Sequence, residues 1–126
     1  MQDHAGEHQR LNDALSRLDR ALRDRDLHTA RLQLAIFATG FDRYVRSEEH
    51  FLFPVVEHLL PAHGASTTKM RREHRSLRNL VVGVKDSLDR FDEPRRFQLL
   101  GDLRSVFLLH TTKEAWVIYP VLGGVS

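Results

Sequence analysis

The residues whose types and spacing suggest chemistry are His110 and Glu114, which lie four positions apart. Side chains at that spacing project from the same face of a helix. An imidazole nitrogen and a carboxylate oxygen held side by side can bind one metal ion. This pair therefore predicts a metal-binding position on a helix in the last part of the sequence.

The same pattern occurs earlier in the chain, displaced by 66 positions. The polar residues matched by this shift are His8 with His74, Tyr44 with His110, and Glu48 with Glu114. The apolar residues also match, since Leu11, Leu15, Leu18 and Leu22 overlay Leu77, Val81, Val84 and Leu88. The chain is therefore interpreted as two copies of one helical hairpin. Tyr44 is the one matched polar position where the residue type differs.

Four amphipathic helices are predicted to carry these residues. The first covers roughly residues 3–24. The second begins at Leu27 and should kink or end near Pro54, whose ring removes a backbone hydrogen bond. A break at residues 61–66 precedes the third helix, and Asp92-Glu93-Pro94 caps and opens the fourth. Short polar turns between such helices predict an all-α, up-down-up-down four-helix bundle.

Each helix carries one stripe of residues that we expect to face the core. The first stripe is His4, His8, Leu11, Leu15, Leu18 and Leu22. The second is Leu27, Ala30, Leu34, Phe37, Phe41, Tyr44, Glu48, Phe51 and Val55. The third is Met70, His74, Leu77, Val81, Val84, Leu88 and Phe91. The fourth is Leu100, Leu103, Phe107, His110, Glu114, Val117 and Val121.

The polar residues on these stripes are predicted to lie at one depth in the bundle. At about 1.5 Å per residue, His8 lies roughly 26 Å from the first turn and Tyr44 roughly 28 Å from it. His74 and His110 lie roughly 26 Å from the second turn, at the same end. A second layer, about 6 Å further out, contains Glu48, Glu114, His4 and Met70.

Length and composition narrow the class of protein. The 126 residues, 41% hydrophobic and 29% charged, predict a single domain over residues 1–126. A net charge of +2 with interspersed signs gives no reason to expect a nucleic-acid partner. The absence of cysteine excludes disulfides and thiolate metal sites. With no run of about 20 apolar residues, we expect a soluble, cytoplasmic protein and no membrane partner.

Each polar residue on a stripe also has a purely structural interpretation. A lone histidine on an apolar stripe is commonly a hydrogen-bonded core residue, but two buried glutamates without partners cost several kcal/mol each. A metal satisfies the whole set at once, so metal binding is favoured. His4 is either part of a frayed terminus or an outer ligand. Residues expected at the surface are His28, His50, His58, His63, Glu49, Glu57, Glu73 and the basic residues Lys69, Arg71, Arg72, Arg75 and Arg78.

Two residues beside the stripes have further interpretations. Glu73 could orient a neighbouring group rather than only face solvent. Trp116 is expected to pack beside Glu114.

Imidazole, carboxylate and phenolate donors without thiolate suit iron, manganese or zinc. Two inward glutamates can each bridge a pair of ions, which favours two metals over one. A di-iron carboxylate site in a bundle core is the nearest precedent, and zinc is the redox-silent alternative.

The sequence resembles the hemerythrin-like (HHE cation-binding) family. The resemblance covers His8 to Pro120 and consists of a first-helix histidine, E-E-x-x-L-F-P from Glu48, E-H at Glu73, and H-x-x-x-E from His110. It implies a non-haem di-iron centre with an oxo or hydroxo bridge. It also implies that His8, His74 and His110 are terminal ligands and that the carboxylates of Glu48 and Glu114 bridge the irons.

Two positions depart from the family pattern. The family usually has histidine at Tyr44, and the oxygen carrier hemerythrin has a further histidine at Met70. A phenolate ligand stabilises ferric iron, whereas an oxygen carrier must rest in the ferrous state. Some hemerythrin-like proteins resembling this one decompose hydrogen peroxide like a catalase. The sequence therefore favours peroxide decomposition, with Tyr44 as a ligand or hydrogen-bond donor and His4 as a further ligand or proton shuttle.

Other functions remain open at this point. The protein is alternatively a sensor or reservoir for oxygen, nitric oxide or iron. Family members that repair iron-sulfur centres usually carry an additional cysteine-bearing segment, and this sequence has no cysteine.

Overall fold

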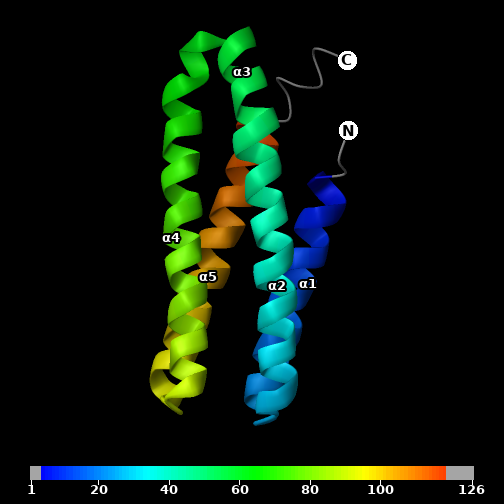
Figure 1. The fold of residues 1–126 in the computed structure, drawn as a ribbon, viewed down its shortest axis with the longest axis vertical. Helices are drawn as coiled ribbons and strands as arrows, with labels where there is room; N and C mark the ends of the chain where they lie inside the picture. The colour runs from blue at the N-terminus through cyan, green and yellow to red at the C-terminus, as the bar shows by residue number, and fades with distance from the viewer. Residues whose placement is uncertain (1–3, 119–126) are drawn as a thin grey trace.

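The structure is a computed structural model and describes residues 4–118. Its long helices are α1 (His4–Arg23), α2 (Leu27–Ser47), α4 (Gly64–Asp89) and α5 (Glu93–Lys113). A π-helical turn, η1 (Glu48–Leu52), joins α2 to the short helix α3 (Phe53–Leu59), and the 3-10 turn η2 (Pro61–His63) leads into α4. A second π-helical turn, η3 (Glu114–Ile118), follows α5. Figure 1 shows the four long helices running along one axis, with α3 continuing α2, so the predicted up-down-up-down bundle is confirmed.

The two interhelical turns at one end of the bundle have the same construction. Asp26 caps α2 by accepting a hydrogen bond from the Thr29 amide, and Asp92 caps α5 by accepting one from the Arg95 amide. The residue before each cap has a φ of 57°: Arg25 in one turn and Phe91 in the other. The internal repeat therefore extends to the backbone conformation of the turns.

One of these two residues with positive φ, Phe91, does not lie in the core where it was predicted. Phe91 was expected on the stripe of the third helix, but its side chain is 71% exposed. The α4 helix ends at Asp89, so Phe91 lies in the turn and no longer follows the helical stripe. The predicted break at residues 61–66 is shorter than expected, because α4 already begins at Gly64.

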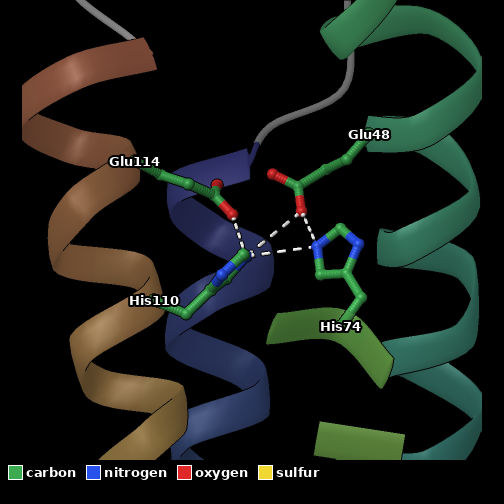
Figure 2. A group of neighbouring side chains, drawn as sticks. All are labelled: Glu48, His74, His110 and Glu114. Atoms are coloured by element: carbon green, nitrogen blue, oxygen red, sulfur yellow. Dashed lines mark hydrogen bonds and ion pairs between the residues drawn. The ribbon is translucent and has the colours of Figure 1, made fainter. Parts of the chain in front are cut away.

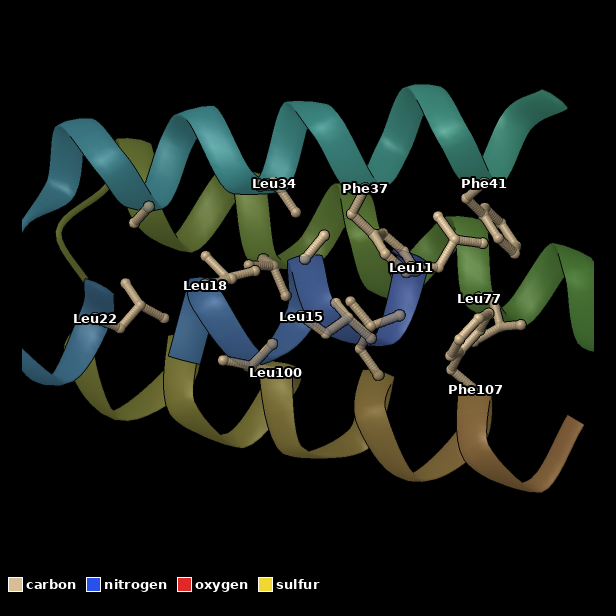
Figure 3. Close-up of a cluster of buried hydrophobic side chains, with 14 of the residues drawn as sticks. Leu11, Leu15, Leu18, Leu22, Leu34, Phe37, Phe41, Leu77, Leu100 and Phe107 are labelled. Atoms are coloured by element: carbon tan, nitrogen blue, oxygen red, sulfur yellow. The ribbon is translucent and has the colours of Figure 1, made fainter. Parts of the chain in front are cut away.

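The core fills the bundle between those turns and the polar residues. Figure 3 shows leucines of α1 packing against phenylalanines of α2 and apolar residues of α4 and α5. The aliphatic and phenylalanine residues of the predicted stripes that are buried in this core are Leu11, Leu15, Leu18, Leu22, Ala30, Leu34, Phe37, Phe41, Leu77, Val84, Leu88, Leu100, Leu103 and Phe107. Burying one large apolar side chain of this kind stabilises the fold by about 1.5–3 kcal/mol. This core fixes the register at which the four helices present their polar side chains.

The two π-helical turns begin at the two glutamates of the repeat, Glu48 and Glu114. Such a turn inserts one extra residue and shifts every later side chain around the helix axis. Phe51 and Val55, which were predicted to be buried, are therefore 72% and 44% exposed. Leu52, Phe53 and Val56 are buried in their place, together with Met70.

Candidate metal centre

Four side chains from three helical segments meet in the interior of the bundle (Figure 2). His74 Nε2 lies 2.8 Å from Glu48 Oε1 and 3.2 Å from His110 Nε2. His110 Nε2 lies 2.5 Å from Glu114 Oε1 and 3.5 Å from Glu48 Oε1. All four residues are fully buried, and one potential ligand atom from each lies within 4.8 Å of the others.

Helix α1 and the end of α2 add two more polar side chains to this group. Tyr44 is fully buried, and its hydroxyl donates a short hydrogen bond to Glu114 Oε1. His8 Nε2 lies 2.8 Å from the Tyr44 hydroxyl and 3.3 Å from Glu114 Oε2. The His8 side chain is 12% exposed, so it lies closer to solvent than the other five. The four chain segments of the bundle therefore all supply donors to the cluster.

Two further carboxylates contact the histidines from outside the cluster. Glu49 Oε2 lies 2.7 Å from His74 Nδ1, and Glu73 Oε1 lies 2.9 Å from His110 Nδ1. Lys113 Nζ donates to the other oxygen of Glu73 at 2.5 Å. Each of the two buried imidazoles thus has one nitrogen facing the cluster and one facing a carboxylate.

Aromatic rings separate the polar cluster from the surrounding core and from solvent. The Phe53 ring stacks on His74, with ring centroids 5.6 Å apart and an interplanar angle of 11°. Phe41 contacts His74 edge-on at 6.3 Å, and Phe107 contacts His8 edge-on at 6.5 Å. These rings keep water away from the donors, and electrostatic interactions inside the cluster are strengthened as a result.

Burial changes the acidity of one of the two repeated carboxyls. Desolvation raises the pKa of Glu48 to about 7, although hydrogen bonds from His110 and His74 oppose the rise. Glu48 therefore retains a proton at a pH where an exposed glutamate is ionised. Its Oε2 atom is buried and has no hydrogen-bond partner among the described residues.

The other half of the cluster forms a buried ion pair. Burial alone would lower the pKa of His110, but hydrogen bonds and charge from Glu114 and Glu48 raise it to about 10. Burial also opposes ionisation of Glu114, yet hydrogen bonds from His110 and His8 hold its pKa well below the usual value. Near neutral pH the metal-free cluster thus contains an imidazolium between carboxyl groups.

The donor set fits a bound cation. Two ring nitrogens, His74 Nε2 and His110 Nε2, face each other, and an unpartnered carboxyl oxygen of Glu48 lies in the same buried space. An unpaired buried polar atom costs about 1–3 kcal/mol. A cation that replaces the protons of Glu48 and His110 would satisfy all of these atoms together. The residues therefore suit a metal ion with oxygen and nitrogen ligands.

Comparison with known families agrees with this chemistry. Residues 4–122 match the hemerythrin HHE cation-binding domain. The chain belongs to this family. No curated protein and no solved structure matches the chain. Together, the family and the buried His/Glu cluster identify this HHE domain as a cation-binding protein.

The structure brings together all six residues predicted from the sequence to form the site of this HHE domain. They are His8, Tyr44, Glu48, His74, His110 and Glu114. Their role as metal ligands remains a prediction. The side chain of His4 lies outside the part of the molecule that the structure describes, so its predicted role as ligand or proton shuttle is not tested. The same holds for the predicted positions of His63, Val117 and Val121.

The sequence pattern placed some neighbours of the site incorrectly. Glu49 was expected at the surface, but its carboxylate contacts His74. Glu73 was expected either to face solvent or to orient a neighbour, and it does contact His110. Trp116 was expected to pack beside Glu114 and is instead 80% exposed, because it lies within the π-helical turn η3. Among the expected surface histidines, His28, His50 and His58 are exposed.

The sequence contained a signal for both carboxylates. Glu49 directly follows Glu48, and Glu73 directly precedes His74. A residue next to a ligand points to another side of a regular helix, which is why Glu49 was placed in solvent and why solvent was one of the two positions expected for Glu73.

A membrane span is a separate question from the site. Among the residues that the structure describes, no helix has the length and apolar character needed to cross a bilayer.

Proposed function

We propose that this HHE domain holds two iron ions and decomposes hydrogen peroxide. The observation that carries the proposal is the position of Tyr44, whose buried hydroxyl contacts both Glu114 and His8. An anionic phenolate oxygen at that position favours ferric iron more than a neutral imidazole does. Such a preference suits peroxide chemistry better than reversible oxygen carriage, which requires a ferrous resting state.

The proposed ligands divide into bridging ligands, which would contact both ions, and terminal ligands, which would contact one. Glu48 and Glu114 come from equivalent positions of the repeat, and His110 lies within 3.5 Å of an oxygen of each. We propose that these two glutamates bridge the ions. The terminal ligands would then be His8, Tyr44, His74 and His110. Manganese suits the same donors, and zinc would give a site without redox activity.

The overall reaction converts two molecules of hydrogen peroxide into one of oxygen and two of water. One peroxide loses two electrons and two protons, and the other gains them while its O–O bond breaks. When bound, the iron pair supplies the Lewis acidity and the electron transfer for this exchange. The chain supplies sites for protons, since Tyr44 Oη donates to Glu114 Oε1 and His8 Nε2 lies beside the same hydroxyl.

The surroundings of the site limit the class of ligand. Tyr44, Glu48, His74, His110 and Glu114 are all fully buried. Aromatic rings pack against His74 of this group and against the neighbouring His8. A small neutral molecule such as hydrogen peroxide, oxygen or nitric oxide enters such a space more readily than a charged or bulky substrate.

Oxygen evolution after addition of hydrogen peroxide tests this proposal directly. We expect the iron-loaded protein to release oxygen catalytically and the metal-free protein not to do so. A stable oxygen adduct of the reduced protein, with no turnover of peroxide, would contradict peroxide decomposition and support oxygen carriage.

The role of Tyr44 needs a separate measurement. If the phenolate is a ligand, the ferric protein should show a visible charge-transfer band that is absent in Tyr44→Phe, with iron content retained. An unchanged spectrum in that variant would show that Tyr44 acts only as a hydrogen-bond donor. Phenylalanine is a suitable replacement because it keeps the ring contacts with Phe41 and His74.

The second candidate is binding without turnover, as a sensor or store for oxygen, nitric oxide or iron. The cation-binding family and the two buried histidines, His74 and His110, are compatible with it. Iron bound at two ions per chain, with a nitric oxide or oxygen adduct but no oxygen evolution from peroxide, would favour this candidate. A cytoplasmic location and a single domain over residues 1–126 remain predictions from composition and length.

A further inference from the structure

Glu49 and Glu73 lie outside the proposed ligand set but each contacts a ring nitrogen of a buried histidine. The contacts are 2.7 Å from Glu49 to His74 Nδ1 and 2.9 Å from Glu73 to His110 Nδ1. Both imidazoles direct the opposite nitrogen, Nε2, at the interior of the cluster. In both histidines, which lie on different helices, a carboxylate contacts Nδ1 while Nε2 faces the interior of the cluster.

The partner of one ring nitrogen decides what the other can do. A neutral imidazole carries a single N–H, and its position depends on the hydrogen bond that it makes. An ionised carboxylate only accepts, so a carboxylate at Nδ1 holds the proton there. The Nε2 lone pair is then free for a metal, and the partial negative charge passed to the ring makes it a stronger donor.

We propose that Glu49 and Glu73 are positioning residues that hold His74 and His110 in the metal-binding tautomer and orientation. This inference rests on the proposed metal binding and goes further, because it assigns a role to residues that are not ligands. It also predicts that each carboxylate acts through one particular histidine.

The backbone around Glu49 is consistent with this role. Glu49 belongs to the π-helical turn η1, directly after Glu48. A π-helical turn is wider than a regular helical turn, so two successive side chains can be directed toward a neighbouring helix. Glu48 and Glu49 thereby contact the two nitrogens of the same His74 ring, at 2.8 and 2.7 Å.

Glu73 is held by a second contact of its own. Lys113 Nζ donates to Glu73 Oε2 at 2.5 Å, which leaves Oε1 for His110 Nδ1. Each oxygen of Glu73 therefore contacts a different partner, and these two contacts fix the orientation of the carboxyl group toward His110.

The first test measures Co²⁺ affinity by competition with a chelator, because Co²⁺ binds similar donors to Fe²⁺ and resists oxidation. Glu49→Gln and Glu73→Gln should each weaken the affinity about 10–100-fold. The control is Glu57→Gln, since Glu57 is a partly buried carboxylate of α3 that contacts Arg71 and Thr67. This control should bind Co²⁺ as the wild type does.

A double-mutant cycle separates positioning from the loss of a negative charge. If Glu49 acts through His74, Glu49→Gln should have no further effect in the His74→Ala protein and its full effect in the His110→Ala protein. Glu73→Gln should show the reverse pattern. Equal losses in every background would show that the carboxylates act only as nearby charges, and would overturn the inference.

Nitrogen NMR of the imidazole rings supplies a readout that needs no metal. In the metal-free wild type we expect the proton of His74 on Nδ1, and in Glu49→Gln we expect it shared with or moved to Nε2. An unchanged His74 ring would contradict the positioning role. A wild type that binds no Co²⁺ would contradict the proposed function, whereas the NMR result would still decide the role of Glu49.

Discussion

The two helical hairpins of this bundle have matching backbones but different donors. In both, an aspartate caps the second helix and a glutamate begins a π-helical turn. The donors differ one helical turn before that glutamate, where the first hairpin has Tyr44 and the second has His110. The comparison shows that the repeated backbone sets where the donors lie, while single substitutions set their chemistry.

The difference extends to the carboxylates around the histidines. The residue equivalent to Glu73 is Glu7, and the residue equivalent to Glu49 is Ala115. Glu73 contacts His110, whereas Glu7 Oε2 is buried without a hydrogen-bond partner among the described residues. By the same equivalence, a histidine introduced at residue 44 is predicted to contact Glu7.

The largest expected effect comes from removing what the two hairpins share. Glu48→Ala and Glu114→Ala should each lower iron affinity by more than about 100-fold, since each glutamate is proposed to contact both ions. Metal analysis after dialysis gives the iron content of each variant. The two variants should lose metal to a similar extent because the two positions are equivalent in the repeat. Full occupancy in either one would argue against bridging.

Making the hairpins alike at one position should separate binding from turnover. Tyr44→His should retain iron but lose the charge-transfer band. Its rate of oxygen evolution should fall by about tenfold or more, and a tenfold fall corresponds to about 1.4 kcal/mol of activation free energy. Adding Glu7→Gln to this variant should weaken its metal affinity, because the new imidazole would lose its carboxylate partner. Unaltered turnover in Tyr44→His would show that the phenol is not needed for the reaction.

The pH dependence of the metal-free protein follows from the two raised pKa values. Glu48 and His110 both have a folded pKa above the ordinary value, at about 7 and about 10. Their stabilising contributions are present at low pH and are lost as the pH rises through those values. The melting temperature of the metal-free protein should therefore fall between about pH 5 and pH 10. Added metal should reverse this trend, because binding releases both protons.

The control for this prediction is Glu48→Gln, which cannot ionise. It should remove the part of the decline below about pH 7 and leave the part due to His110. A melting temperature of the metal-free wild type that rises steadily from about pH 5 to pH 9 would contradict the assigned protonation states.

The smallest expected effect concerns glycines that distinguish the hairpins. A Cβ added at Gly101 would have no atom within 4 Å, and the equivalent residue in the first hairpin is Ala35. Gly101→Ala should stabilise the fold by about 0.5–1 kcal/mol. Gly40→Ala should gain less or destabilise, because its Cβ would lie 3.0 Å from Leu11 Cδ2. Thermal melts measure both, and an equal gain at both sites would contradict the close packing at Gly40.

The sequence predicted the bundle because its apolar spacing, its capping residues and its repeat all point to the same fold. It also predicted which six side chains meet, since depth along a regular helix follows from residue number alone. The π-helical turns could not be derived in this way, because spacing arguments assume a constant 3.6 residues per turn. Phe51, Val55 and Trp116 were misplaced for that reason.

The partners of the carboxylates around the histidines could not be predicted from the sequence, because they depend on contacts between helices. Glu49 and Glu73 lie beside predicted ligands in the sequence, but which ring each would meet depends on how α2, α4 and α5 pack.

A proline lies six positions after each of the two repeated glutamates, at Pro54 and Pro120. This spacing is common to both hairpins and accompanies the π-helical turns, but proline alone predicts only a kink or an end of the helix.

Anomalous X-ray diffraction at the iron edge, on crystals of the iron-loaded protein, tests the central claim most directly. The account predicts two iron peaks in each chain, both between Glu48 and Glu114, with His8, Tyr44, His74 and His110 as the remaining protein ligands. Iron bound at another place, or six side chains that contact only one another in the iron-loaded crystal, would contradict it.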